Sequence, residues 1–323
     1  MIGQTLVEKI AEDFGMDVWQ LLTIVRSSPY RYKEFEVRKK DGGLRRIAQP
    51  SRETKRLQRW LVDEWLVNFP VHSSCTAYVK GKGIKDNASV HSSSSFLLKV
   101  DFRQFFPSIE PQDFFSHVKK HWPLPVAEQD LVAAANIVFW KPKSGGDFRL
   151  SIGGPASPVI SNTILFDLDT KLNGRCENLD VIYTRYADDL TFSSNDKNSL
   201  LAVKSYLDTL LSEIEYPRLS LNDRKTVFVS KKHSRRVTGL VLSNDGKVSL
   251  GRERKRLIRA MLHRCSCGEF NETEKTQLRG LLAFASDVEP DFVDRMRAHY
   301  GKGLLEGLMR MPLDTGKKLH GDY

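Results

Sequence analysis

Two adjacent aspartates, Asp188 and Asp189, lie between two β-prone runs in the segment 181–193 (V-I-Y-T-R-Y-A-D-D-L-T-F-S). These runs predict two strands joined by a tight turn, with the aspartates at or beside its tip. One interpretation is a plain hairpin turn, because the short Asp side chain can bond nearby backbone. The other is a metal site for phosphoryl transfer, since adjacent carboxylates repel each other unless a cation lies between them. Such a site needs further oxygen ligands, and Asp101 can supply one.

Asp101 ends the apolar run F-L-L-K-V-D at 96–101, which predicts a short strand. An acidic residue at the carboxyl end of a strand is a frequent feature of α/β sites, although an isolated Asp there is as often a turn former. The chemistry therefore depends on whether the fold brings Asp101 to the aspartate pair.

Composition indicates a globular protein with a polyanionic partner. The 323 residues are 40% hydrophobic and 28% charged, enough for two or three packed subdomains. Lys and Arg number 50 against 40 Asp and Glu, giving a formal net charge of +10, for which nucleic acid or a membrane surface are the candidates. The sequence shows neither a long uncharged apolar run nor a signal peptide, so we expect a cytoplasmic protein without a membrane partner. The four cysteines fit a reducing compartment and are expected to be structural thiols.

The first half of the chain supplies basic surfaces. Two short helices are expected in 4–26, followed by a hairpin over 32–49 around an Asp-Gly-Gly turn. Three basic residues are expected near the tip of that hairpin, where they form either a solvated face or a phosphate contact: Lys39, Lys40 and Arg45. Ser51 is a predicted N-cap of a helix running to about Val67.

Residues 78–95 are rich in Gly, Ser and Lys and predict a loop. Asn87 and His91 lie within it on an expected short helical turn, where the plain interpretation of His91 is a surface residue.

The second half contains a further close-approach turn and a second basic region. Gly153 and Gly154 precede an expected helix with Ser157 as its N-cap, and such a glycine pair lets another backbone or a flat ligand come close. A strand is expected to carry Asn222 and Lys225. The helix after Gly251 has three arginines on one side, which suit a polyanion: Arg252, Arg256 and Arg259.

Four motifs together resemble the palm of a reverse transcriptase: K-V-D-F-x-x-F-F at 99–106, G-G-P-A-S-P at 153–158, Y-A-D-D at 186–189 and N-D-R-K-T at 222–226. The resemblance extends from roughly Tyr30 to Gly301. Two further motifs resemble the signatures of bacterial retron reverse transcriptases, namely N-A-x-x-H at 87–91 and Val237-Thr238-Gly239.

The resemblance implies an α+β, right-hand polymerase fold. It assigns N-terminal helices and fingers to 1–95, a palm with inserted fingers helices to 96–250, and a helical thumb to 251–323. It also implies that two Mg²⁺ ions are bound by Asp101, Asp188, Asp189 and the carbonyl of Phe102.

Further residues match nucleotide contacts of the family. Phe106 matches the bulky residue that excludes a 2′-hydroxyl, which implies deoxynucleoside triphosphates as substrates; the alternative is core packing, since on a strand only one of Phe105 and Phe106 can face the site. Arg45 with Lys39 or Lys40 matches triphosphate contacts. The remaining matches are nucleotide contact at Gly153 and a general acid for pyrophosphate at Lys225. The sequence departs from common family patterns at Ile152, Ala156 and Gln104, which affects nucleotide and template contacts.

We therefore interpret the chain as an RNA-directed DNA polymerase of retron type that copies part of a cognate structured non-coding RNA into single-stranded DNA joined to it, primed at a 2′-hydroxyl, in anti-phage defence with an effector protein. The two signature motifs and the basic helix are the expected RNA contacts, at Asn87, His91, Val237, Thr238, Gly239, Arg252, Arg256 and Arg259. A group II intron-like or diversity-generating reverse transcriptase is the alternative within the enzyme class, the first being disfavoured by the lack of a maturase or endonuclease extension in the sequence. The alternative from another class is a catalytically idle RNA-binding scaffold, which would have no need for three close carboxylates.

Overall fold

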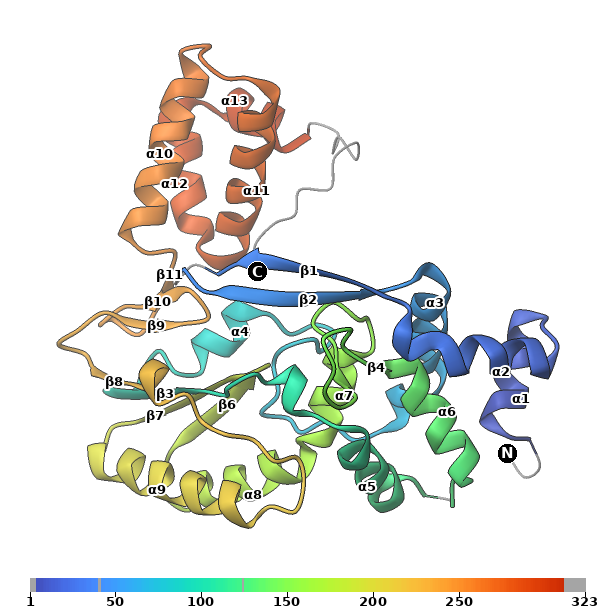
Figure 1. The fold of residues 1–323 in the computed structure, drawn as a ribbon. Coiled ribbons are helices and arrows are strands. Elements are labelled where there is room, and N and C mark those ends of the chain that lie inside the picture. Colours follow the sequence, from blue (N-terminus) through green and yellow to red (C-terminus); the bar gives the residue numbers. More distant parts are fainter. Residues whose placement is uncertain (1–3, 40–41, 124, 311–323) are drawn as a thin grey trace. The chain divides into compact units, whose positions relative to one another are not determined.

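The computed structural model describes residues 4–39, 42–123 and 125–310, which divide into two compact units (Figure 1). Unit 1 comprises residues 1–83 and 95–228, and unit 2 comprises residues 84–94 and 229–323. Helices and antiparallel strands occur in both units, which confirms the predicted α+β class. The three-part division into fingers, palm and thumb describes functional parts rather than compact units and stays a prediction.

Unit 1 begins with two helices and a long hairpin, as the sequence predicts. Its helices are α1 (Leu6–Phe14), α2 (Val18–Ser27), α3 (Arg52–Trp60), α5 (Pro111–His121), α6 (Glu128–Val138), α7 (Ser157–Ile164), α8 (Phe166–Glu177) and α9 (Lys197–Glu213). Its strands are β1 (Tyr32–Arg38), β2 (Leu44–Pro50), β3 (Phe96–Asp101), β4 (Phe139–Trp140), β5 (Arg149–Leu150), β6 (Ile182–Tyr186), β7 (Asp189–Ser194) and β8 (Val227–Ser230), the last reaching the boundary of the unit.

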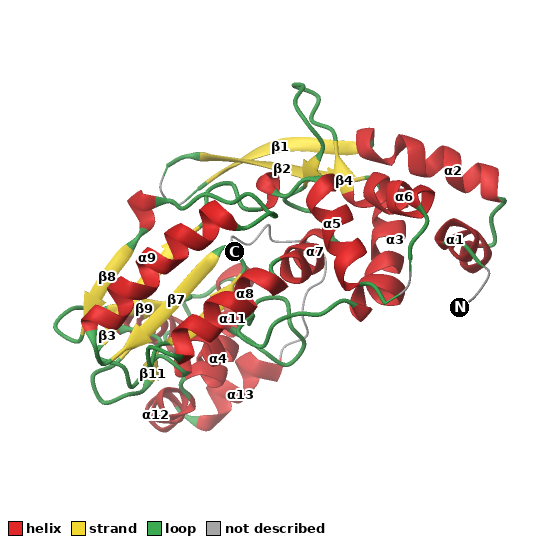
Figure 2. Ribbon diagram, turned by 90° about the horizontal axis from the view of Figure 1, so that it is seen from below, coloured by secondary structure: helices red, strands yellow, loops and turns green. Residues whose placement is uncertain are grey.

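A four-stranded sheet in the order β6-β7-β3-β8 carries the aspartates. β7 pairs antiparallel with both β6 and β3. Helices α8 and α9 cover one face of this sheet (Figure 2). Apolar side chains such as Val100, Leu190 and Phe192 are buried in the core, and each contributes roughly 1.5–3 kcal/mol to folding through the surface it removes from water. A rigid layer therefore lies under the turn that bears Asp188.

Two local expectations for unit 1 are wrong. Ser157 is the first residue of α7 rather than its N-cap, because the backbone of Ala156 before it is already helical (φ −80°, ψ −24°). Asn222 and Lys225 do not lie on a strand. They belong to a 3₁₀ turn (Asp223–Lys225) that is closed by the bond from the Lys225 N–H to the Asn222 carbonyl (2.9 Å) and precedes β8.

The helix predicted from 52 to about 67 has the expected N-cap, since the Ser51 hydroxyl accepts from the Thr54 N–H. Regular α-helix ends at Trp60, however, and the segment continues as a π turn (Leu61–Trp65) and a 3₁₀ turn (Leu66–Asn68).

Unit 2 contains a small sheet and a group of helices. The elements are α4 (Ile84–Ser89), β9 (Arg235–Val237), β10 (Leu240–Leu242), β11 (Val248–Ser249), α10 (Arg252–Ser266), α11 (Glu272–Val288), α12 (Pro290–Tyr300) and α13 (Lys302–Arg310). The sheet has the order β11-β10-β9, and α4 packs against all three strands. Glu289 fixes the start of α10, because its carboxylate accepts from Lys255 Nζ (2.6 Å) and from the Leu250 N–H (3.2 Å).

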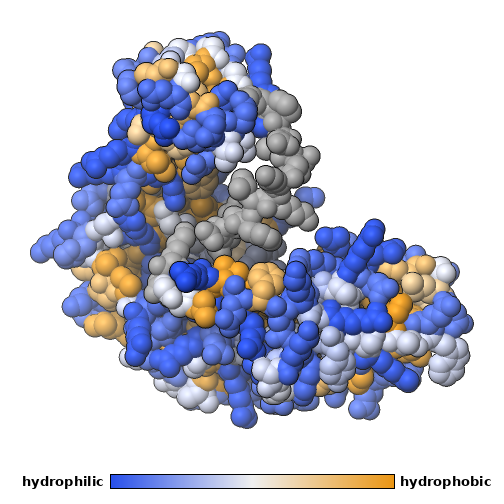
Figure 3. Space-filling model, turned by 45° about the horizontal axis from the view of Figure 1, so that its top comes forward, coloured by the Kyte–Doolittle hydropathy of each residue, from blue (hydrophilic) through white to orange (hydrophobic). Residues whose placement is uncertain are grey.

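Hydrophilic side chains cover most of the visible face of each unit, with apolar residues in scattered patches (Figure 3). Within the part of the chain that the structure describes, none of the helices combines the length and the apolar character needed to span a membrane.

Candidate active site

The three predicted carboxylates meet at one end of the four-stranded sheet. Asp101 ends β3 and lies directly opposite Asp189, the first residue of β7. Residues opposite each other in an antiparallel pair have Cβ atoms about 5 Å apart. Asp188 precedes Asp189 in the turn from β6, and its carbonyl oxygen accepts a bond from the Phe102 N–H (3.2 Å). Two segments more than eighty residues apart in sequence thus bring their carboxylates together.

The electrostatics of the cluster favour a bound cation. Burial, followed by the charges of Asp189 and Asp101, raises the pKa of Asp188 to about 6. Burial also raises the pKa of Asp189, with a further contribution from Asp101 and opposition from Lys99. Each carboxylate therefore disfavours the charge of the next, and a divalent ion would relieve that repulsion.

Lys225 binds the carboxylate that ends β3. Its Nζ donates to both oxygens of Asp101, at 3.1 and 3.0 Å, and Asn222 Nδ2 donates to one of them at 3.4 Å. Burial lowers the pKa of Lys225, but the hydrogen bond and charge of Asp101 outweigh it and the net shift is upward. Lys225 is therefore a charged ammonium group, the state in which it can act as a general acid.

The donor set fits divalent metal ions in its chemistry. Carboxylate oxygens are the ligands that Mg²⁺ prefers, and three of them gather here. Over residues 4–39, 42–123 and 125–310, no three His, Cys, Asp or Glu side chains are already arranged around one point as a ligand set. The ligand set would therefore have to close around the ions, with Asp101 exchanging Lys225 for metal.

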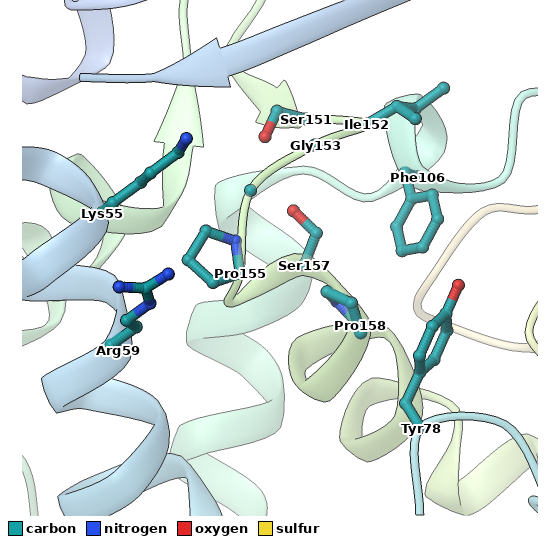
Figure 4. Close-up of a pocket in the computed structure, with 11 residues that line it drawn as sticks. Lys55, Arg59, Tyr78, Phe106, Ser151, Ile152, Gly153, Pro155, Ser157 and Pro158 are labelled. Atoms are coloured by element: carbon teal, nitrogen blue, oxygen red, sulfur yellow. The ribbon is translucent and has the colours of Figure 1, made fainter. Parts of the chain in front are cut away.

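A cavity of about 370 Å³ opens in unit 1, between α3 and the Phe106 turn. Its lining includes Lys55, Arg59, Tyr78, Phe106, Gly153 and Pro158. Lys55 and Arg59 lie across the cavity from Phe106 and Tyr78 (Figure 4). Burial and then the charge of Asp188 raise the pKa of Tyr78, so its hydroxyl lies within electrostatic reach of the carboxylates.

The structure separates the two adjacent phenylalanines. Phe105 is 4% exposed and stacks on Phe102 with ring centroids 5.8 Å apart, whereas Phe106 is half-buried and lines the cavity. The segment is a turn leading into a 3₁₀ helix (Phe106–Ser108) rather than a strand. Phe106 is therefore the one of the pair that can meet a nucleotide.

Gly153 allows the hairpin strand β2 to approach the glycine turn. Its φ is +121°, and a Cβ there would lie 3.2 Å from Ile47 Cγ2 and 3.3 Å from the Ala48 carbonyl oxygen. The Ala48 N–H donates to the Ile152 carbonyl (3.0 Å). The absence of a side chain at Gly153 therefore allows the backbone of β2 to come close. Gly153 also lines the cavity.

The basic residues of the β1–β2 hairpin are open to solvent. Lys39 and Arg45 are exposed, and within the described residues neither side chain makes an ion pair or hydrogen bond. The charge of Arg45 acts to lower the pKa of Tyr78, so the two side chains lie within electrostatic range of each other. Lys40 lies outside the described residues.

Comparison with known proteins decides the family. Residues 37–242 match the family model described as "Reverse transcriptase (RNA-dependent DNA polymerase)". The chain is 34% identical over 310 residues to the retron Ec83 reverse transcriptase of Escherichia coli, covering 95% of this chain and 97% of that protein. The chain belongs to the retron reverse transcriptases. Two further relatives from Escherichia coli agree, retron Ec73 (32% identity, 85% of this chain and 89% of that protein) and retron Ec86 (31%, 90% and 89%).

The chain is thus an RNA-directed DNA polymerase, and membership of the family confirms the predicted right-hand polymerase fold. Reverse transcriptases use divalent metal ions, in agreement with the gathered carboxylates. RNA template and deoxynucleotides are the substrates of this activity.

The two signature motifs of this retron reverse transcriptase meet inside unit 2. Asn87 and His91 are fully buried, so the plain interpretation of His91 as a surface residue is wrong. Burial lowers the pKa of His91 to about 3, which keeps its imidazole neutral. The Thr238 hydroxyl donates to the Ile84 carbonyl (3.1 Å) and so fastens the second motif to the first residue of α4.

Thr238 and Gly239 form the two-residue turn between β9 and β10, with φ values of +46° and +79°. Positive φ is unusual for a β-branched residue and indicates a conformation held by its surroundings. Val237 is buried behind this turn, Thr238 is half-buried and Gly239 is exposed. The signature thus offers a small, fixed surface rather than a row of open side chains.

The predicted basic face of α10 exists. Ile258, Met261 and Leu262 face the core of unit 2, whereas Arg252, Arg256 and Arg259 are exposed. Arg259 lies over the ring of Phe292 at 5.4 Å from its centroid.

Several residues that the structure brings to the site carry no local sequence signal for that role. Tyr78 lies in a segment read as a loop, and its φ of +58° depends on surroundings that no local pattern shows. Lys55 and Arg59 lie on the helix that begins after Ser51, and no local pattern shows that they line a cavity. Arg185 and Asp169, which form a buried pair behind the aspartate turn, resembled ordinary surface charges.

Proposed function

We propose that this enzyme copies part of a cognate structured non-coding RNA into a single-stranded DNA that stays joined to it, with a 2′-hydroxyl of that RNA as the primer. Similarity to retron reverse transcriptases along nearly the whole chain supports this product. The observation that carries the catalytic part is the register of Asp101 opposite Asp189, with Asp188 beside them.

We further propose that Asp101, Asp188, Asp189 and the carbonyl of Phe102 hold two Mg²⁺ ions. When bound, such ions lower the pKa of the primer hydroxyl and stabilise the triphosphate and its leaving pyrophosphate. With Asp101 bound to metal, Lys225 would be free to protonate the pyrophosphate. Its two hydrogen bonds to Asp101 support this role, because they keep the ammonium group beside a carboxylate that would hold the ions.

The remaining nucleotide contacts that we propose come from the β1–β2 hairpin and from the wall of the cavity. Arg45 and Lys39, with Lys40 as expected from the sequence, bind the triphosphate through their free charges. Phe106 lies under the sugar and excludes a 2′-hydroxyl, so deoxynucleotides are selected. Gly153 forms part of the wall on which the nucleotide rests.

Recognition of the cognate RNA is proposed for unit 2. The exposed turn at Thr238 and Gly239 meets the RNA by shape and through 2′-hydroxyl contacts, as structured RNA is usually read. Asn87, His91 and Val237 act from behind, by holding this turn in place. Arg252, Arg256 and Arg259 on α10 bind phosphates of any sequence.

The biological setting follows from the substrates and the family. A cytoplasmic enzyme has access to both the RNA and deoxynucleoside triphosphates. We propose a role in anti-phage defence in which the RNA, its DNA copy and this enzyme bind an effector protein.

The proposal is tested by expressing the chain together with the transcribed region next to its gene and isolating the DNA formed. The expected product is single-stranded DNA that remains attached to RNA after denaturation and is released by an enzyme that cleaves 2′,5′ linkages. DNA with a free 5′ end, unaffected by that enzyme, would contradict 2′-hydroxyl priming without touching the polymerase assignment.

A further inference from the structure

A fully buried ion pair lies behind the aspartate turn in unit 1. Arg185 is the fourth residue of β6 and Asp169 lies in the first turn of α8, and both side chains are 0% exposed. Arg185 Nη2 donates to Asp169 Oδ2 at 2.7 Å, and its Nε donates to Oδ1 at 2.9 Å. The Tyr183 hydroxyl donates to the same carboxylate at 2.8 Å. Tyr183 and Arg185 are two positions apart on β6, so both side chains lie on the face of the strand that packs against α8.

All three nitrogens of the Arg185 guanidinium group donate hydrogen bonds. Beyond Asp169, Nη1 donates to Asn162 Oδ1 and to the Ala187 carbonyl, both at 3.3 Å, and Nη2 reaches the Asn162 carbonyl at 3.5 Å. Arginine has five N–H donors in a fixed plane, whereas lysine has three on a flexible stem. A lysine in this place would keep the charge and lose most of the contacts.

One of these contacts acts on the catalytic turn itself. Ala187 has φ +56°, a left-handed conformation that costs an L-residue roughly 1–2 kcal/mol. Its carbonyl, directly before Asp188, is the acceptor for Arg185 Nη1. The strained turn is therefore held from below by a side chain that cannot move without breaking a buried network.

The same network reaches the segment that carries Tyr78. Asn162 Nδ2 donates to the Ala77 carbonyl at 2.9 Å. The backbone of Arg185 also bonds the residues just before Ala77. Its N–H donates to the Ser74 carbonyl, and its carbonyl accepts from the Thr76 N–H, both at 2.9 Å. Tyr78 follows at φ +58° with its ring in the cavity beside Phe106 (Figure 4).

Stability does not explain the pair. A buried ion pair can often be replaced by apolar residues of similar volume without loss of stability, because the desolvation of two charges offsets their attraction. Apolar residues could not, however, donate to the Ala187 carbonyl or to Asn162.

We propose that Arg185, held by Asp169 and Asn162, is a positioning residue. It keeps the turn that carries Asp188 at a fixed position relative to Tyr78, which lines the nucleotide cavity. This inference rests on the proposed role of Asp188 as a metal ligand. Arg185 would act on the polymerase reaction only through the position of the Asp188 turn, because its buried side chain contacts neither substrate nor metal.

The test replaces both charges together, as Arg185→Met with Asp169→Leu, so that no buried charge is left without a partner. We expect the melting temperature to fall modestly, because Tyr183, Asn162 and the Ala187 carbonyl each lose a hydrogen bond while no buried charge is left alone. The kcat for primer extension should fall roughly 100-fold, the loss that a misplacement of about 1 Å can cause. The Mg²⁺ concentration for half-maximal activity should rise, and the increase in melting temperature that Mg²⁺ causes in the wild type should shrink.

Tyr183→Phe is the matched control, because it removes a hydrogen bond to the same carboxylate from the same face of β6 without touching the turn. Its kcat and Mg²⁺ dependence should equal those of the wild type. If the paired variant is folded at the assay temperature and keeps its kcat within about threefold of the wild type, the positioning role is refuted.

Should the paired variant fail to fold, Asn162→Ala decides the question, since it leaves the ion pair intact and removes the amide between Arg185 and Ala77. We expect a raised KM for deoxynucleotides and a lowered kcat, and unchanged values of both would overturn the proposal. Failure of the metal site itself has a different signature: activity retained in Asp188→Asn refutes that assignment whatever the Arg185 variants do.

Discussion

Truncation of Phe106 to alanine should relax the choice of sugar at a small cost in stability. Phe106 is half-buried at the wall of the cavity, so its removal loses only part of the roughly 3–5 kcal/mol that truncation of a core phenylalanine costs. We expect a loss of about 1–2 kcal/mol in the free energy of unfolding. A difference in size of a few atoms in a pocket is worth roughly 10–200-fold in selectivity, so the preference for deoxy- over ribonucleotides should fall by about 10–100-fold.

The assay compares kcat/KM for matched deoxy- and ribonucleoside triphosphates in extension of an annealed primer. Phe105→Ala provides the matched control one residue away, because Phe105 is 4% exposed and stacks on Phe102. It should cost roughly 3–5 kcal/mol of stability and leave the sugar preference unchanged. An unchanged preference in Phe106→Ala, or an equal change in both variants, would refute the assignment of Phe106 to the sugar.

Three other predictions concern pH, phosphate binding and RNA choice. His117 is 1% exposed, with no hydrogen-bond partner for either ring nitrogen among the described residues, and burial followed by the His121 charge lowers its pKa to about 3. Below about pH 6.5 only the unfolded chain takes up this proton, so the free energy of unfolding falls as pH falls. In urea unfolding at pH 5, His117→Leu should avoid about 2 kcal/mol of the loss that the wild type shows, and equal pH slopes for the two proteins would refute this. Replacing Arg252 and Arg256 with alanine should weaken RNA binding and lower the salt slope of its log-log plot by about 2, whereas a slope as steep as that of Lys302→Ala, the charge control on α13, would exclude phosphate contacts. Thr238→Ala should impair synthesis primed on the cognate RNA far more than extension of an annealed primer on an unrelated template, and equal losses would show that the turn serves the polymerase fold.

The sequence predicted the hairpin of Asp188 and Asp189 because its signals are local. Two β-prone runs flank the aspartates and predict two strands and a turn, and the structure has β6 and β7 on either side of that turn. Asp101 was a candidate because it ends a short apolar run, and the resemblance then matched it to the metal ligands, but no local pattern determines its register opposite Asp189. Phe105 and Phe106 show the limit, since the sequence named the pair but their separation depends on a turn and not on strand alternation.

The sequence did not predict which polar residues are buried by segments that lie far away along the chain. His91 lies in a segment of loop-like composition, yet it is 0% exposed because the segment 84–94 packs against strands that come some 150 residues later. Arg185 resembles a surface charge on a strand until Asp169 is placed beneath it. The positive φ of Ala187 depends on such tertiary contacts and has no counterpart in local composition.

The central claim, that the carboxylates beside the β6–β7 turn are the polymerase metal site, is tested most directly by primer extension with Asp188→Asn at saturating Mg²⁺, with a thermal melt of the same protein in the absence of Mg²⁺. Asp180→Asn, the same chemical change on an exposed residue two positions before β6, is the control. We predict no detectable extension by Asp188→Asn and a melting temperature equal to or above that of the wild type at pH 8, because a carboxylate with a raised pKa no longer has to ionise beside Asp189 and Asp101. Extension at the rate of the Asp180→Asn control would contradict the account.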